Sequence, residues 1–235
     1  MDTQIRLEDV DVDGAVREAH ADAVEALERS GDTRASFMRK VGLAGGSLLA
    51  GGTVLGALLP STALAAGGRP PSSFGSGDVG ILNYALTLEY LESAFYDEAY
   101  ANLYSSAPAN VRQFMSTTRV DEADHVALLK GTLGAKATAK PKFDFGQAVT
   151  SLATFEATAF VLENTGVAAY SGQAFNISSA KVLGVALSIV TVEARHAGAI
   201  ASITGKQISP DGPFDAPDTA AKVLAAVAGT KFIVS

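Results

Sequence analysis

Two of the three histidines in the chain each follow a glutamate by three positions, in Glu122-x-x-His125 and Glu193-x-x-His196. On an α-helix, residues three apart lie on the same face, so each pair presents a carboxylate and an imidazole toward one point. Carboxylate and imidazole groups together suit iron or manganese, and they also accept zinc. The doubled spacing therefore predicts a metal site to which two helices contribute.

A glutamate and a tyrosine seven positions apart precede each of these motifs, as Glu89 with Tyr96 and as Glu163 with Tyr170. Folding each half of the chain at its central turn brings its two glutamates level, so we expect four carboxylates and two imidazoles to meet around two divalent cations. The predicted ligands are Glu89, Glu122, His125, Glu163, Glu193 and His196. We expect the two tyrosines to donate hydrogen bonds to carboxylates of the opposite hairpin, with ordinary core packing as the alternative.

Two further glutamates are alternative ligands. Glu92 lies one helical turn after Glu89, and Glu156 lies two turns before Glu163, so either could face the cluster instead. We prefer Glu89 and Glu163, because only these keep the matched spacing to a tyrosine. Burying so many carboxylates without cations would be costly, which favours bound metal. The sequence assigns no residue a catalytic role.

Helical periodicity is strong beyond residue 77, and it predicts an all-α fold. The predicted helices cover about residues 78–104, 108–133, 144–170 or one turn further, 178–205, and 219–228. Pro108 suits a first helical turn, Ser178 a helix N-cap, and Gly205 a C-terminal stop. The last and shortest helix is apolar, and we expect it to pack back on the others.

The connection over residues 134–143 indicates the bundle topology. Ten extended residues reach about 33–36 Å, and a helix of 26 residues is about 39 Å long. The connection can therefore run nearly the length of the bundle, which allows the second and third helices to lie parallel. A simple up-down-up-down bundle would need only a few residues there.

The first 66 residues are interpreted as a leader with an export signal. A basic segment over residues 33–40 is followed by an uncharged stretch over residues 41–59 and by Ala63-Leu64-Ala65, which is the order of such a signal. The segment resembles a twin-arginine signal in which Ala35 replaces the second arginine. A retained membrane anchor over residues 41–59 is the alternative. The remaining predicted parts are a linker over residues 67–77, the bundle over 78–205 and a proline-containing tail over 206–235.

Composition excludes several classes of protein. The net charge is −7 and the chain has no long basic tract, so we expect no nucleic-acid partner. The chain has no cysteine, which excludes disulfides, thiolate metal sites and cysteine nucleophiles. Any metal is therefore bound through oxygen and nitrogen.

Four segments carry a resemblance to a known family: residues 82–92, 122–126, 163–170 and 192–197. With these motifs, nearly all of the chain from Asp78 to Val234 resembles ferritin-like domain proteins of the type that includes plant and bacterial desiccation-related proteins, which are often exported in bacteria. The resemblance implies a ferritin-like four-helix bundle with a crossover and a dimetal site. Proteins with this fold include iron-storage ferritins, rubrerythrin-like peroxidases and manganese catalases, so the fold alone does not fix the reaction.

The expected function is that of an exported, periplasmic or extracytoplasmic protein with a dimetal site of iron or, next, manganese. Its expected partners are metal ions and O₂ or peroxide, with a second copy of the chain as a further candidate, and the membrane only through the N-terminal segment. It would be an oxidoreductase of the peroxidase, catalase or ferroxidase type acting in stress protection. The alternative is a non-catalytic desiccation-related protein that uses metal only for stability.

Overall fold

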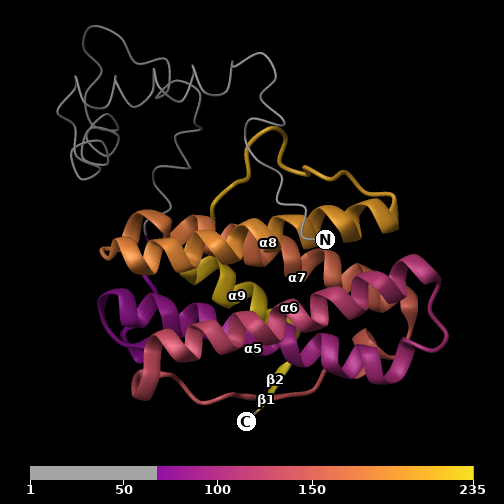
Figure 1. Cartoon of the computed structure of the whole chain (residues 1–235), viewed down its shortest axis with the longest axis horizontal. Coiled ribbons are helices and arrows are strands. Elements are labelled where there is room, and N and C mark those ends of the chain that lie inside the picture. The colour runs from indigo at the N-terminus through magenta and orange to yellow at the C-terminus, as the bar shows by residue number, and fades with distance from the viewer. Residues whose placement is uncertain (1–67, 235) are drawn as a thin grey trace, which may run out of the picture. The chain divides into compact units, whose positions relative to one another are not determined.

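Four long helices dominate the computed structural model, which describes residues 68–234 (Figure 1). They are α5 (Gly77–Leu103), α6 (Ala109–Leu133), α7 (Leu152–Gln173) and α8 (Ala180–Thr204), followed by the shorter α9 (Ala220–Thr230). Helix α5 packs chiefly on α6, and α7 chiefly on α8, so the bundle consists of two hairpins. This is the expected four-helix bundle with a short C-terminal helix. The predicted leader and export signal lie outside the described residues.

Short elements connect the helices. The 3₁₀ turns are η1 (Ser72–Phe74), η2 (Gly134–Lys136), η3 (Gly146–Val149) and η4 (Ala174–Asn176), and the strands are β1 (Lys142–Phe143) and β2 (Ile233–Val234). The two strands pair antiparallel, with Phe143 opposite Ile233. The end of the chain is thereby attached to the connection between α6 and α7.

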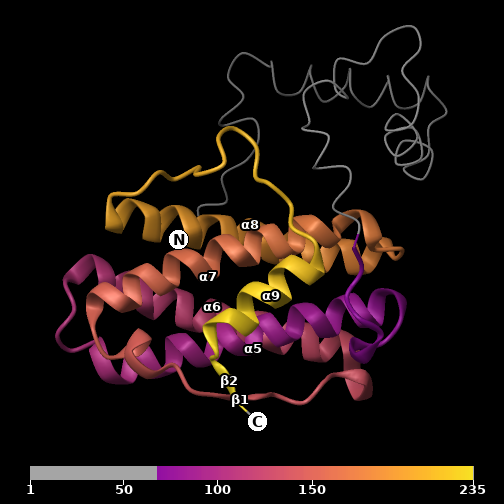
Figure 2. The ribbon, with the colours of Figure 1, turned by 180° about the vertical axis from the view of Figure 1, so that it is seen from behind.

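That connection runs along α5 for the length of the bundle, as both views show (Figures 1 and 2). The side chain of Asn83, on α5, fixes its first part. The Asn83 amide donates to the carbonyl of Lys136 at 3.0 Å, and its oxygen accepts from the backbone N–H of Thr138 at 2.9 Å. The predicted crossover is therefore present, and hydrogen bonds hold it against the helix.

Helix α7 begins at Leu152, eight residues after the predicted start at Asp144. The Asp144 carboxylate instead accepts the backbone N–H of Gly146 at 3.0 Å, and Gly146 has a φ of +49°, which breaks the helical path. The N-cap of α7 is Ser151, whose hydroxyl accepts the N–H of Thr154 at 3.2 Å. The start predicted at Asp144 was wrong because local turn chemistry there outweighs helical periodicity.

Helix α8 starts one residue later than predicted. Its N-cap is Ser179, which accepts the N–H of Val182 at 3.4 Å, whereas the predicted cap, Ser178, has its own N–H bound to Asp78 at 2.9 Å. The other carboxylate oxygen of Asp78 accepts the N–H of Ser179 at 2.8 Å. This carboxylate thus joins the N-terminal ends of α5 and α8.

Helix α5 is buried on all sides over residues 80–93. The other hairpin and the crossover cover it, and α9 crosses the same face of the bundle (Figure 2). Phe95 stacks on Phe155 and meets Phe145 edge to face, and Val223 and Val227 of α9 join this cluster. The middle of α5 is therefore held rigidly where its glutamates project.

Helix α8 has the length and apolar composition of a membrane span, alone among the helices of residues 68–234. It also carries two buried polar residues, Glu193 and His196, on the side that packs in the bundle. These residues explain the placement of α8 as a core helix.

Candidate metal centre

Four fully buried glutamates converge at the middle of the bundle, one from each long helix. Glu89 comes from α5, Glu122 from α6, Glu163 from α7 and Glu193 from α8, and each is 0% exposed. Two histidines, His125 on α6 and His196 on α8, complete the group at 8% and 5% exposed. The six residues predicted as ligands therefore lie together.

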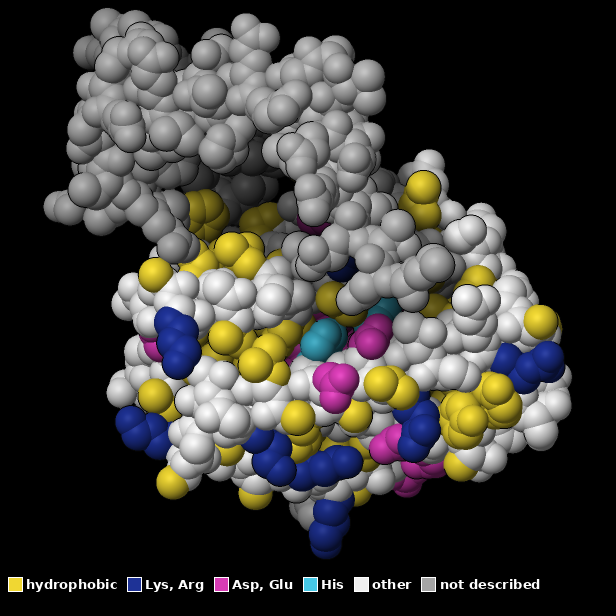
Figure 3. All heavy atoms as spheres, in the orientation of Figure 1, with side chains coloured by type: hydrophobic (Ala, Val, Ile, Leu, Met, Phe, Trp, Pro, Cys, Tyr) yellow, Lys and Arg dark blue, Asp and Glu magenta, His cyan; other side chains and the backbone are white. Residues whose placement is uncertain are grey.

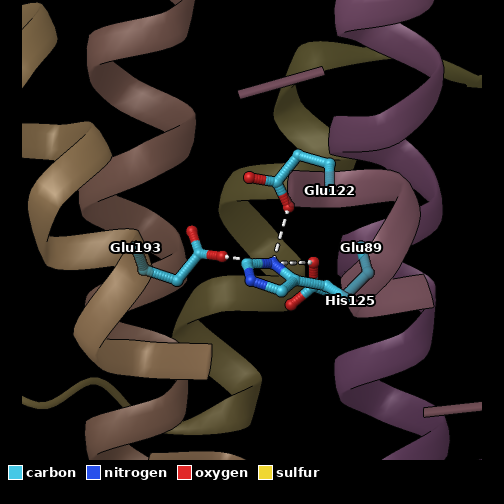
Figure 4. Close-up of side chains that lie close together, drawn as sticks. All are labelled: Glu89, Glu122, His125 and Glu193. Carbon is cyan, nitrogen blue, oxygen red and sulfur yellow. Dashed lines mark hydrogen bonds and ion pairs between the residues drawn. The ribbon is translucent and has the colours of Figure 1, made fainter. Parts of the chain in front are cut away.

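The first set of ligands surrounds His125 (Figure 4). The Nδ1 atom of His125 lies 3.0 Å from an oxygen of Glu122, 3.1 Å from one of Glu193 and 3.3 Å from one of Glu89. These four residues offer atoms that all lie within 4.8 Å of one another. Such a set can hold one cation with three oxygens and one nitrogen.

The second set surrounds His196. Its Nδ1 atom lies 3.0 Å from Glu122 Oε1 and 3.3 Å from Glu163 Oε2, and Glu193 completes the set within the same 4.8 Å limit. Glu122 and Glu193 belong to both sets. The two imidazole rings are 6.3 Å apart between centroids. The two sets could therefore hold two adjacent cations, and they share Glu122 and Glu193.

The unpartnered atoms of the cluster show that these residues fit metal ions better than one another. Buried polar atoms normally have a hydrogen-bond partner. Six atoms at the cluster have none within the described part of the chain: Oε2 of Glu89, Oε1 of Glu122, Oε2 of Glu163, Oε1 and Oε2 of Glu193, and Nδ1 of His196. Nδ1 of His196 is 3.0 Å from a carboxylate oxygen without hydrogen-bond geometry. Two divalent cations would satisfy these atoms and balance four carboxylate charges.

Two tyrosines connect the hairpins through the cluster. Tyr96 of α5 donates its hydroxyl hydrogen to Oε1 of Glu163, and Tyr170 of α7 donates to Oε1 of Glu89. Burial, and then the adjacent carboxylate, raise the pKa of both hydroxyls, so both remain donors. Each bond orients one carboxylate and leaves its second oxygen facing the cluster.

A family comparison agrees with the fold. The sequence matches the family model described as a ferritin-like domain over residues 77–206. The chain belongs to the ferritin-like domain family. Among curated proteins, a search finds no significant match to this chain.

Burial and the close approach of like and unlike charges shift the pKa of several groups in the cluster of this ferritin-like domain. Burial raises the pKa of Glu122 to about 7, and burial together with Glu122 raises that of Glu193 well above its ordinary value. Burial alone would lower the pKa of His196, but its contacts with Glu122 and Glu163 outweigh this and raise the pKa to about 11. The pKa of His125 is raised for the same reason. Metal must therefore displace protons from this site.

The two alternative ligands lie differently in the ferritin-like domain. Glu92 is 3% exposed, and burial, followed by the nearby charge of Glu193, raises its pKa well above the ordinary value. It nevertheless belongs to neither four-residue set. Glu156 is only partly buried on α7 and also lies outside both sets. The structure thus brings Glu89 and Glu163 into the cluster, and it leaves Glu92 beside it.

Two neighbours of the ferritin-like cluster were missed by sequence reasoning. Asp121 contacts Nε2 of His196 at 3.0 Å, on the ring edge away from the cluster. Gly166 leaves room for Glu193, since a Cβ there would lie 2.8 Å from its Oε2. The position of Asp121, directly before a predicted ligand, was a usable signal. The position of Gly166, three residues after Glu163, was another.

Proposed function

We propose that this ferritin-like domain binds two divalent cations, iron or manganese, and uses them to react with O₂ or peroxide in stress protection. The observation that carries the proposal is the convergence of six buried ligand atoms that have no hydrogen-bond partner among the described residues. When bound, such a pair of cations supplies one-electron and two-electron redox chemistry.

The side chains of the cluster would bind the cations, orient the ligating carboxylates and shield the site from water. Glu122 and Glu193 lie in both ligand sets, so they would hold the cations at a fixed separation. The tyrosine hydroxyls fix the two remaining carboxylates, each at one oxygen. The complete burial of all four glutamates excludes water, which strengthens their electrostatic interaction with cations. The same side chains can carry the protons that accompany reduction of O₂ or peroxide.

Metal analysis tests the proposal directly. The purified protein, loaded anaerobically with Fe(II) or Mn(II), should hold two ions per chain, and Glu122→Gln should reduce this number. Glu156→Gln is the matched control, because Glu156 lies on a bundle helix outside both ligand sets. Wild type should then oxidise Fe(II) or consume peroxide. Well under two ions in wild type would refute the dimetal site.

A purely structural use of metal is the second candidate, favoured by the unpartnered buried carboxylates, which make the metal-free bundle unstable. In that case metal would raise the melting temperature of wild type with no detectable peroxide or ferroxidase turnover. Replacing Glu122 and His125 by alanine would abolish this stabilisation. Turnover measured on fully loaded protein therefore separates the two candidates.

Export is proposed from residues 33–65, which carry the signal-like pattern. Removal of the signal after Ala65 would leave a chain that begins next to the ferritin-like domain. Mass spectrometry of the protein isolated from its native cell envelope should find this shortened N-terminus. An intact N-terminus in the membrane fraction would instead support the anchor over residues 41–59.

A further inference from the structure

A groove lined by apolar and polar side chains lies on the bundle surface between α6 and α8. It has a volume of about 470 Å³, and its lining includes Thr117, Thr118, Asp121, Arg195 and His196. Histidine side chains, cyan in Figure 3, reach the surface on this face beside acidic side chains in magenta. On the opposite face, α9 covers the bundle (Figure 2). The groove is therefore a direct approach from solvent to the histidine side of the cluster.

Two polar side chains of the groove have apolar residues at the equivalent positions of the internal repeat. Helices α6 and α8 carry the same Glu-x-x-His motif 71 positions apart. At that spacing Asp121 corresponds to Val192, and Thr118 corresponds to Ile189, which is 1% exposed. The internal repeat therefore does not duplicate these two polar side chains. Of the two histidines of the cluster, His196 lines the groove.

Two side chains of the groove are suited to a hydrated cation. The carboxylate of Asp121 is 35% exposed and contacts the ring of His196, whose other nitrogen faces the cluster. The hydroxyl of Thr118 is fully buried beside them and has no partner within residues 68–234. An unpartnered buried hydroxyl is costly unless water or a ligand satisfies it. The carboxylate of Asp121 attracts a cation to the inner end of the groove, whose lining also includes the positively charged Arg195. The hydroxyl of Thr118 can replace one of the waters of the cation.

We infer that divalent cations enter the cluster through this groove and fill the position of His196 first. The inference rests on the proposed function, because it requires the cluster to bind metal. Asp121 acts as a positioning residue at the inner end of the route. The corresponding positions of α8, Val192 and Ile189, offer a cation neither charge nor hydroxyl.

Site-specific labelling tests the route. The chain has no cysteine, so a thiol label attaches only at an introduced cysteine. In the Thr117→Cys variant, a bulky maleimide attached at the groove should slow the uptake of Co(II) at least about tenfold. Stopped-flow absorbance measures the rate of uptake. The matched control is Ser188→Cys, since Ser188 is an exposed residue at the position of α8 that corresponds to Thr117. Its label should leave the rate unchanged. Both labelled proteins should still bind two Co(II) ions at equilibrium.

The order of filling has its own measurement. Crystals of wild type with one equivalent of Mn(II) should show stronger anomalous scattering beside His196 than beside His125. Equal occupancy, or uptake slowed equally by both labels, by neither, or only at Ser188, would overturn the inference. These results differ from failure of the proposed function, in which the unlabelled protein binds no Co(II).

Discussion

Replacing Gly166 by alanine should damage the metal site while leaving the helices intact. The added Cβ would lie 2.8 Å from Oε2 of Glu193, 3.4 Å from its carboxyl carbon and 3.5 Å from Oε1 of Glu92. The first distance is shorter than a carbon and an oxygen tolerate without bonding, so the Glu193 carboxylate must move by several tenths of an ångström. Glu193 belongs to both ligand sets, so both cation positions are affected.

Two opposing terms set the stability of the metal-free variant. Alanine stabilises a helix interior by about 0.5–1 kcal/mol relative to glycine, and the crowding costs about 1–3 kcal/mol. The metal-free protein should therefore change little or become moderately less stable. The stabilisation of the protein by bound metal changes more. If each cation binds tenfold more weakly, the protein loses about 1.4 kcal/mol per ion. For two ions in a domain of this size, this is about 6–11 °C of metal-induced stabilisation.

Thermal unfolding with and without Mn(II) measures this effect. Gly184→Ala is the matched control, because Gly184 lies within α8 and a Cβ there meets no atom within 4 Å. The free energy of unfolding of this control should rise by about 0.5–1 kcal/mol, because alanine favours a helix more than glycine does. Its stabilisation by Mn(II) should equal that of wild type. If Gly166→Ala binds two ions with wild-type affinity, the argument that Glu193 bridges both positions is wrong.

Three further predictions concern the surroundings of the cluster. Asp121→Asn should weaken the first Mn(II) binding event in calorimetric titration by about 10–100-fold, because an outer carboxylate orients the ligating imidazole. Tyr170→Phe should lower the free energy of unfolding by about 1–3 kcal/mol in urea, because it leaves a buried carboxylate oxygen unpartnered. The metal-free protein should lose stability as pH rises between about 6.5 and 9. His196 has a folded-state pKa of about 11 against an ordinary 6.5, so its contribution is complete below pH 6.5 and declines toward 11.

Tyr84→Phe is the matched control for Tyr170→Phe. Tyr84→Phe removes a buried hydroxyl that has no partner in the described residues, so it should be neutral or stabilising. Equal losses in the Tyr84 and Tyr170 variants would contradict the proposed hydrogen bond. The Mn(II)-dependent rise in melting temperature should grow as pH rises, because fewer protons compete for the ligands. A metal-free protein whose stability increases from pH 6.5 to 9 would contradict the raised pKa. Wild-type Mn(II) affinity in Asp121→Asn would remove that residue from the site.

The long helices were predictable because their signals are periodic and redundant. The spacing of Glu89, Tyr96, Glu122 and His125 is meaningful only on helices, so the motif and the fold support each other. The length of the crossover then selected the topology. Short segments lack such redundancy. The residues around Asp144 and Gly146 form a turn and a strand that depend on pairing with the end of the chain.

The surroundings of the cluster were less predictable, because they depend on contacts between helices. The contact between Asp121 and His196 joins residues 75 positions apart, and no local pattern specifies it. The space beside Gly166 depends on how closely α7 approaches the carboxylate of Glu193 on α8. Sequence spacing can place a residue on a helical face. It cannot determine which side chain of another helix lies opposite.

The C-terminal helix extends the cooperative unit beyond the region of family similarity, which ends at residue 206. Ala220, Val223 and Val227 are buried in the same apolar cluster as Phe155, and the backbone N–H of Asp218 donates to α7. A polypeptide cut after residue 206 would therefore expose that apolar surface to water and leave the crossover strand with an open edge. The folded unit is thus longer than the matched region, and mutations near the C-terminus can loosen the bundle around the cluster without replacing any of its six residues.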